Sequence, residues 1–285
     1  MKEVLVHIPA STANLGPGFD SQAIALNIHN CIRIRRVCGE AQAEIQEEMI
    51  AETARVFFDV SNQKPFEFSC TIDGKVPRAR GLGSSATVRL GVLIGLNKLS
   101  ESSLPVEDLY KVCAKLEEHP DNAAAAAFGG FVITREDLSF RKFDLALSLH
   151  FVLLIPDFEV RTIDARRVIP TSIPTEDAKF SATHAAWVAA AFASQDYNML
   201  RAAFKDKLHQ PYRKPLLPFL DEVIHAAETA GALGGWLSGS GSTVTCLTTT
   251  HPHHVAEAMK QSAPGDSHLL HTVADNLGAR LITCS

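Results

Sequence analysis

The chain has 285 residues, which is enough for one large domain or two modest ones. Apolar residues make up 46% of it and charged residues 21%, a composition that excludes a disordered or fibrous protein. The 27 basic and 32 acidic side chains leave a net charge of −5, so electrostatics gives no reason to expect nucleic acid or an anionic membrane as the partner.

Hydrophobic periodicity and turn residues divide the first half of the chain into short strands and longer helices. In chain order they predict a strand at 4–8 that Pro9 halts, strands at 24–28 and 31–35, a helix at 44–58, a strand at 66–72, helices at 86–99 and 105–119, a helix from 122 that ends at Gly129, and a strand at 131–133.

The second half continues this mixture of strands and helices. It predicts a strand at 150–155, helices at 178–193 and 216–230, a strand at 243–247, a helix at 255–261 and strands at 268–273 and 279–283. The elements lack a strict β-α-β rhythm, which favours an α+β fold over a doubly wound sheet. The natural boundary lies near residue 150, so we predict two domains, 1–150 and 151–285.

The cysteines and the N-terminus predict a cytoplasmic protein. Six cysteines are spread along the chain without a C-x-x-C pair, which indicates free thiols rather than a disulfide framework. The apolar run near the N-terminus is too short for a secretory signal, and no window approaches the ~18 apolar residues that a membrane-spanning helix needs. We therefore expect a reducing compartment and no membrane partner.

The sharpest local signal is a glycine-rich stretch that precedes the helix predicted at 86–99. Gly81 and Gly83 permit unusual backbone angles and a close approach to a ligand, and the start of the helix adds unpaired amides and a partial positive charge. The stretch therefore predicts a phosphate-binding loop. Its members are Pro77, Arg78, Ala79, Arg80, Gly81, Leu82, Gly83, Ser84, Ser85, Ala86 and Thr87.

Two other nucleotide motifs fit this stretch less well. A Walker A loop requires a lysine that is absent here. A dinucleotide fingerprint should follow a strand directly and have an acidic residue ending a second strand ~20 residues later, whereas Pro77 precedes this loop and Glu101 follows a helix. A glycine turn that merely caps a helix remains the alternative for the stretch taken alone.

Six segments, in order and over nearly the whole chain, resemble the motifs of the GHMP kinase superfamily, and in detail those of its homoserine kinase family. They are PASTANLGPGFDS at 9–21, PRARGLGSSA at 77–86, EEHPDN at 117–122, RTIDAR at 161–166, LHQPYR at 208–213 and LSGSG at 237–241. The resemblance implies a two-domain α+β fold, with an N-terminal domain like domain 2 of ribosomal protein S5 and a ferredoxin-like C-terminal domain. It also implies an active site in the cleft between them, and a homodimer.

The same resemblance implies ATP-dependent phosphorylation of the side-chain hydroxyl of L-homoserine, giving O-phospho-L-homoserine in threonine biosynthesis, with ATP and Mg²⁺ as cofactors. Glu117 would bind Mg²⁺ together with Ser85. Glu118 stands where the family usually has glycine, which leaves open which of the two glutamates reaches the metal. The glycines of 237–241 would let that backbone pass close to the phosphate loop, a simple hairpin turn being the alternative.

The remaining site residues are also implied by the resemblance. Arginine forks suit a substrate carboxylate and an acidic group suits an ammonium. The substrate-binding set is Asn14, Asp20, Thr162, Arg166 and Arg213. The catalytic set is Asn122, His119 and Glu117, with His119 and Asn122 orienting the hydroxyl. Phosphoryl transfer would proceed without a dedicated side-chain base, Asp121 being the less favoured alternative.

Two other functions stay open. A sister kinase for another small alcohol or amino acid would keep the phosphate loop and alter the pocket near 181–184, where the chain departs from the family pattern. A non-catalytic sensor of a nucleotide or metabolite would be expected to lose Ser85, Glu117 or Asn122, and all three are present.

Overall fold

The first of two sheets contains the longest strands of the chain. The computed structural model describes residues 2–37, 47–263 and 265–282. In the described chain this sheet has the order β10-β1-β2-β4-β5, with β3 also paired to β2, and every pairing is antiparallel. Its strands are β1 (Glu3–Ala13), β2 (Gln22–Arg36), β3 (Phe68–Gly74), β4 (Phe131–Thr134), β5 (Phe140–Phe143) and β10 (Arg280–Ile282).

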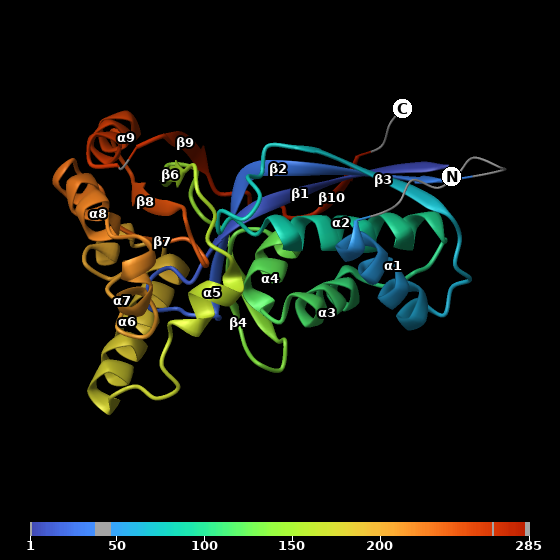
Figure 1. Ribbon diagram of the computed structural model, residues 1–285, viewed down its shortest axis with the longest axis horizontal. Coiled ribbons are helices and arrows are strands. Elements are labelled where there is room, and N and C mark those ends of the chain that lie inside the picture. The colour runs from blue at the N-terminus through green and yellow to red at the C-terminus, as the bar shows by residue number, and fades with distance from the viewer. Residues whose placement is uncertain (1, 38–46, 264, 283–285) are drawn as a thin grey trace.

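Helices α1 to α4 lie along one face of this sheet (Figure 1). They are α1 (Glu48–Ser61), α2 (Ser84–Leu99), α3 (Val106–Glu117) and α4 (Pro120–Phe128). Helix α2 packs closely on β2, because a Cβ added to Gly91 would lie 2.4 Å from a side-chain carbon of Ile32. The alanine run of α4 is likewise buried in this core. Close packing thus fixes where the N-termini of α2 and α4 lie, and both face the candidate site.

The second sheet has the order β7-β8-β6-β9 in the described residues and is also antiparallel. Its strands are β6 (His150–Pro156), β7 (Gly234–Leu237), β8 (Val244–Thr248) and β9 (Ser267–Val273). Numbered along the chain, this order is 2-3-1-4, with helices in the connections between the first and second strands and between the third and fourth. The C-terminal half therefore has the ferredoxin-like topology that the sequence resemblance implied.

Both faces of the second sheet are covered. Phe151 and Leu153 of β6 point into a core shared with the first sheet and α6, whereas Val152 and Leu154 point toward α8 and α9. This alternation is the period-two pattern of a strand buried on both sides. The helical elements of this half are α5 (Thr162–Arg167), α6 (Thr175–Ser194), α7 (Gln210–Arg213), α8 (Leu220–Thr229) and α9 (Pro252–Gln261), with 3₁₀ turns at Tyr197–Leu200 and Lys214–Leu216.

The two sheets are joined by more than the connection near residue 150. Strand β10 pairs with β1, so the C-terminal end of the described chain lies beside its beginning (Figure 1). The Asp275 carbonyl also accepts the Gly130 amide, at 2.8 Å. The division into 1–150 and 151–285 stays a prediction, and residues 280–282 of its second part belong to the first sheet.

Several predicted elements differ in their boundaries. Strand β1 continues through Pro9 to Ala13, with a register shift between Pro9 and Ala10. Proline is tolerated there because β10 pairs with β1 only as far as His7, so in the described chain no residue of β10 faces Pro9. The helix predicted from 216 begins at Leu220, since Pro218 disfavours helical geometry in the residue before it.

The sequence pattern missed the short elements β5, β7, α5 and α7. Residues 44–46 of the first predicted helix and residue 283 of the last predicted strand lie outside the described residues. Cys70, Cys113 and Cys246 are free thiols as expected, and Cys38 and Cys284 lie outside the described residues. Within the described ranges, no helix combines the length and apolar character needed to cross a membrane.

Candidate active site

A pocket of about 300 Å³ lies where the two halves of the chain meet. It brings together the loop after β1, the glycine-rich loop, the corner between α3 and α4, helix α5 and the loop after β7. From the predicted site, its lining contains Asn14, Asp20, Ala79, Arg80, Gly81, Leu82, Gly83, Ser84, Ser85, Glu117, His119, Asn122, Thr162, Arg166 and Arg213. Fifteen positions spread over 200 residues of sequence therefore converge on one cavity.

The glycine-rich loop ends at the N-terminus of α2, which opens toward this pocket. Gly83 precedes the helix with a φ of 66°, and no side chain caps the first turn, which also carries no acidic residue. The first amides of α2 and the positive end of its dipole are therefore available to an anion. A Cβ at Gly83 would lie 2.2 Å from Ser11 Oγ, so a larger residue would displace the Ser11 side chain of β1.

Residues from the second half of the chain form hydrogen bonds with the backbone of the glycine-rich loop. Ser238 Oγ donates to the Gly81 carbonyl at 2.7 Å, and the Thr243 amide donates to the Arg80 carbonyl at 3.2 Å. A Cβ at Gly81 would lie 2.1 Å from the Ser238 carbonyl oxygen. The 237–241 backbone thus passes directly beside the phosphate loop, as its glycines indicated.

Four of the predicted loop residues do not line the pocket. Arg78 is exposed and pairs with Glu47, and Pro77 lies beside it at the start of the loop. Ala86 and Thr87 belong to the first turn of α2, and both are buried. Thr87 donates to the Ser84 carbonyl at 2.7 Å and accepts a hydrogen bond from an asparagine on β2. In these last two, helical geometry turns the side chain into the protein core. Only residues 79–85 of the predicted loop border the cavity.

Glu117 faces the phosphate loop from the end of α3. Its carboxylate accepts from Ser85 Oγ at 2.5 Å and pairs with Arg89 Nε at 2.9 Å. Burial raises the pKa of Glu117, opposed by Ser85 and Arg89. Glu118 instead ends the helix in a left-handed conformation with a φ of 61° and does not line the cavity. A glycine would adopt that conformation without strain, and Glu117 is the glutamate that borders the pocket.

The start of α4 supplies three polar side chains. Asp121 is 1% exposed and accepts from the Asn122 amide at 2.7 Å. Burial, with repulsion from Asp20, raises the pKa of Asp121 to about 7. Asn122 Oδ1 accepts from Ser11 Oγ at 2.7 Å. Burial and the nearby Arg166 lower the pKa of His119, which favours the neutral imidazole.

The substrate-binding residues predicted on the N-terminal loop and α5 contact one another. Arg166 Nη2 pairs with Asp20 at 2.7 Å and also lies 2.9 Å from His119 Nδ1. Asn14 Oδ1 accepts from the Asp20 amide at 3.0 Å. Thr162 lies farther along the wall, with its hydroxyl 3.4 Å from that of Ser240. A cation, an anion, an amide and a hydroxyl thus border the cavity.

Arg213 is a buried cation without a carboxylate partner among the described residues. It is 2% exposed, and its guanidinium donates to the carbonyls of Ala165 at 3.0 Å and Gly239 at 2.9 Å. Burial, with repulsion from Arg166, lowers the pKa of Arg213 to about 10, so it remains charged at neutral pH. The site therefore holds a positive charge that a ligand anion would neutralise.

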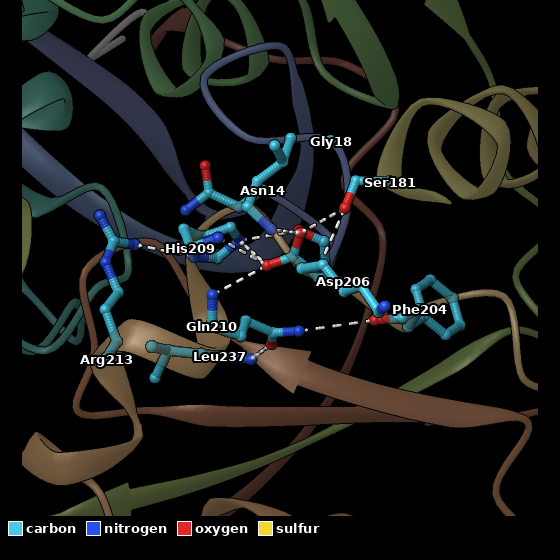
Figure 2. Close-up of polar contacts among 12 residues, drawn as sticks. Asn14, Gly18, Ser181, Phe204, Asp206, His209, Gln210, Arg213 and Leu237 are labelled. Atoms are coloured by element: carbon cyan, nitrogen blue, oxygen red, sulfur yellow. Dashed lines mark hydrogen bonds and ion pairs between the residues drawn. The ribbon is translucent and has the colours of Figure 1, made fainter. Parts of the chain in front are cut away.

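Several residues at the site were not predicted. Arg89 follows Ser85 by one helical turn, so their i, i+4 spacing on α2 was a signal that both face Glu117. Ser11 and Ser238 lie inside recognised motifs without an assigned role. His209 also lies in a quoted motif without an assigned role, and Asp206 precedes that motif; both lie behind Arg213 (Figure 2).

Family comparisons agree with this architecture. The model for the GHMP kinases N terminal domain matches residues 48–130, and the model for GHMP kinases C terminal matches residues 188–265. A crystal structure of mevalonate kinase from Methanococcus jannaschii shares the fold at 14% identity, with a TM-score of 0.74 over 95% of this chain and 98% of that one. The lysine-free phosphate loop and Glu117 both lie within the first of these matched parts, and the chain belongs to the GHMP kinases.

More similar relatives narrow the assignment. The chain is 36% identical over 271 residues to homoserine kinase of Halothermothrix orenii, covering 89% of this chain and 87% of the relative. It is 38% identical over 268 residues to that of Moorella thermoacetica, covering 90% of each. The crystal structure of homoserine kinase from Cytophaga hutchinsonii matches with a TM-score of 0.87 at 25% identity, over 99% of this chain and 98% of that one. The chain belongs to the homoserine kinase family.

Proposed function

We propose that this protein transfers the γ-phosphoryl group of ATP to the side-chain hydroxyl of L-homoserine, producing O-phospho-L-homoserine for threonine biosynthesis. The observation that carries the proposal is the buried Arg213 guanidinium, which borders the pocket without a carboxylate partner in the described chain. Such a cation is costly unless a ligand supplies the opposite charge. The α-carboxylate of an amino acid fits that requirement, and a hydrogen bond between a guanidinium and a carboxylate is stronger than one between neutral groups.

The ammonium group of the amino acid would lie beside a carboxylate and an amide. Asp20 offers a carboxylate to the substrate ammonium, and Asn14, which holds the Asp20 backbone, adds an amide beside it. Arg166 balances Asp20 when the pocket holds no substrate. Arg213, Asp20 and Arg166 therefore alternate in charge along the wall, which suits a zwitterion better than a neutral alcohol.

The phosphate groups of ATP would bind at the N-terminus of α2, where residues 81–85 present their backbone to the pocket. Glu117 and Ser85 offer a carboxylate and a hydroxyl, the oxygen ligands that Mg²⁺ accepts beside phosphate oxygens. No group of three or more His, Cys, Asp or Glu side chains suited to a metal occurs in the described part of the chain, which fits an ion held largely by the nucleotide. Bound there, Mg²⁺ would neutralise charge on the phosphates.

Transfer requires the homoserine hydroxyl oxygen to attack the γ-phosphorus as the bond to the ADP oxygen breaks. Asn122 and the neutral His119 can hold that hydroxyl in line. The hydroxyl proton passes to the transferred phosphoryl group or to solvent, because a loose transition state needs little activation of the nucleophile. Asp121 lies beside Asn122 but is occupied by hydrogen bonds from it.

A coupled assay of ADP release with homoserine, threonine, serine and mevalonate tests the proposal. Homoserine should give the highest kcat/KM. Faster turnover of another alcohol would favour a sister kinase, and no turnover with any of the four would favour a non-catalytic sensor. In the same assay, Arg213→Ala should raise the homoserine KM by about 30-fold to several thousandfold, from the 2–5 kcal/mol that follows loss of one partner of a buried charge pair. Arg201→Ala, on the exposed surface, is the matched control.

The homodimer and the cytoplasmic location remain predictions for this chain. Size-exclusion chromatography with light scattering would test the first. Imaging of the tagged protein in its own cells would test the second.

A further inference from the structure

His209 is buried immediately behind the arginine that we assign to the substrate carboxylate (Figure 2). Its Nδ1 lies 3.2 Å from Arg213 Nη1, and its Nε2 lies 2.7 Å from the Gly16 carbonyl oxygen. Since a guanidinium only donates and a carbonyl only accepts, the proton of this imidazole resides on Nε2 and Nδ1 accepts from Arg213. The carbonyl of Gly16 thereby selects the tautomer of His209 whose Nδ1 can accept a hydrogen bond from Arg213.

The imidazole is neutral at physiological pH. Burial lowers the pKa of His209 to about 4, and the nearby Arg213 cation acts in the same direction. The Asp206 carboxylate lies 3.5 Å from Nε2 and opposes this shift, and the Phe19 ring stacks on the imidazole with centroids 4.9 Å apart. The Nδ1 lone pair therefore stays available to Arg213.

Asp206 fixes the backbone that carries His209. Its fully buried carboxylate accepts from the amides of Leu208, His209 and Gln210 at 2.7, 2.9 and 2.8 Å. It also accepts from Ser181 Oγ at 3.2 Å, which ties this turn to α6. Four hydrogen bonds to one carboxylate leave the turn before α7 little freedom.

The Arg213 guanidinium then has three fixed acceptors. Nε donates to Ala165, and Nη1 donates to both Gly239 and His209. Nη2 has no hydrogen-bond partner in the part of the chain that the structure describes, and Arg213 borders the pocket. These three acceptors set the plane of the guanidinium and leave Nη2 for a ligand.

We propose that His209 is a positioning residue for Arg213: by accepting from Nη1 it orients the guanidinium for the α-carboxylate and so sets the affinity for amino-acid substrates. This inference rests on the proposed function. It extends that function to a residue that does not touch substrate and that acts only through Arg213.

Three variants of His209 distinguish loss of the hydrogen-bond acceptor at Nδ1 from loss of the volume of the ring. His209→Asn keeps an acceptor oxygen near the position of Nδ1, His209→Gln places its amide near Nε2 and has no acceptor at the δ position, and His209→Leu has no polar group. Gln and Leu should raise the homoserine KM by about 10- to 100-fold, the range for losing a hydrogen bond to a charged group. Asn should stay within about threefold of wild type, and the KM for ATP should stay constant in every variant.

A substrate without the carboxylate supplies the decisive control. 3-Aminopropan-1-ol keeps the ammonium and hydroxyl of homoserine, so its kcat/KM should be low and equal in wild type and His209→Gln. An equal fall with both substrates would mean that the variant damages the site as a whole, and it would refute the proposal. Should the Gln variant not fold, Asn and Leu provide the same comparison.

Failure of this inference is distinguishable from failure of the function. Absence of homoserine turnover in the wild-type protein would refute both. Normal wild-type turnover, with an unchanged homoserine KM in His209→Gln and His209→Leu, would refute only the role of His209.

Discussion

Asp121→Asn should make the ligand-free protein more stable at neutral and alkaline pH. The carboxyl is 1% exposed, and its pKa rises from 3.8 in the unfolded chain to about 7 in the folded protein, chiefly through burial. Below pH 3.8 both states bind the proton. As the pH rises from 3.8 to 7 the unfolded chain releases it first, so stability is lost across this window.

The size of this loss follows from the shift in pKa. Between pH 5 and pH 8 the folded protein should lose about 3 kcal/mol through this one group, at 1.36 kcal/mol per unit of pKa. Asparagine has nearly the same shape, and its oxygen can still accept from the Asn122 amide. The variant lacks the ionisation, so its advantage over wild type should grow by about that amount over the same interval.

Urea unfolding followed by circular dichroism at pH 5, 6, 7 and 8 measures this difference. Asp73→Asn, on the exposed side of β3, controls for the loss of one negative charge. Stability curves of wild type and Asp121→Asn that run parallel across this range would refute the argument. Turnover of the same variant tests the mechanism: kcat should fall by less than about tenfold, whereas loss of a general base costs about 10² to 10⁴.

Two further predictions concern the phosphate end of the site. Gly83→Ala should raise the KM for ATP at least about tenfold, because its φ of 66° is strained for alanine and its Cβ would lie 2.2 Å from Ser11 Oγ. Gly265→Ala is the control with a φ of 51° and nothing within 4 Å of its Cβ, and equal effects in both variants would contradict the steric argument. Glu117→Gln keeps the shape but loses the charge, so kcat should fall about 100-fold or more and the Mg²⁺ concentration for half-maximal rate should rise. Glu118→Gln should stay near wild type in both measurements, and a reversed order of the two variants would move the metal to Glu118.

The sequence predicts this fold best where a pattern is long and local. The apolar run at 150–155 became β6, and the alanine run after Asn122 became the buried helix α4. Strand β5 has only four residues, two of them exposed, so its pattern carries little signal. Pro9 misled the strand prediction because its tolerance depends on where β10 stops pairing, a fact about the other end of the chain.

The same distinction applies to the site. The ordered motifs predicted most of the residues that line the pocket, because each motif is a local arrangement of backbone and side chain. The function of His209 depends instead on a carbonyl at Gly16 and a guanidinium at Arg213, and the Gly16 contact spans 193 positions of sequence. Helix α7 has only four residues, too few for periodicity, and its start is fixed by the Asp206 carboxylate. Such a network becomes apparent only when the fold brings its parts together.

The electrostatics of the ligand-free pocket link catalysis to stability. Arg213 is charged and buried with a lowered pKa, while burial raises the pKa of Glu117. Both shifts mean that the protein alone compensates these charges incompletely. The substrate carboxylate would neutralise the charge of Arg213, and the metal bound with the nucleotide would neutralise that of Glu117. Because ligands that bind only the folded state stabilise it, homoserine and Mg-ATP should each protect this protein against unfolding. Homoserine should do so by placing a negative charge beside Arg213, and Mg-ATP by placing a positive charge beside Glu117.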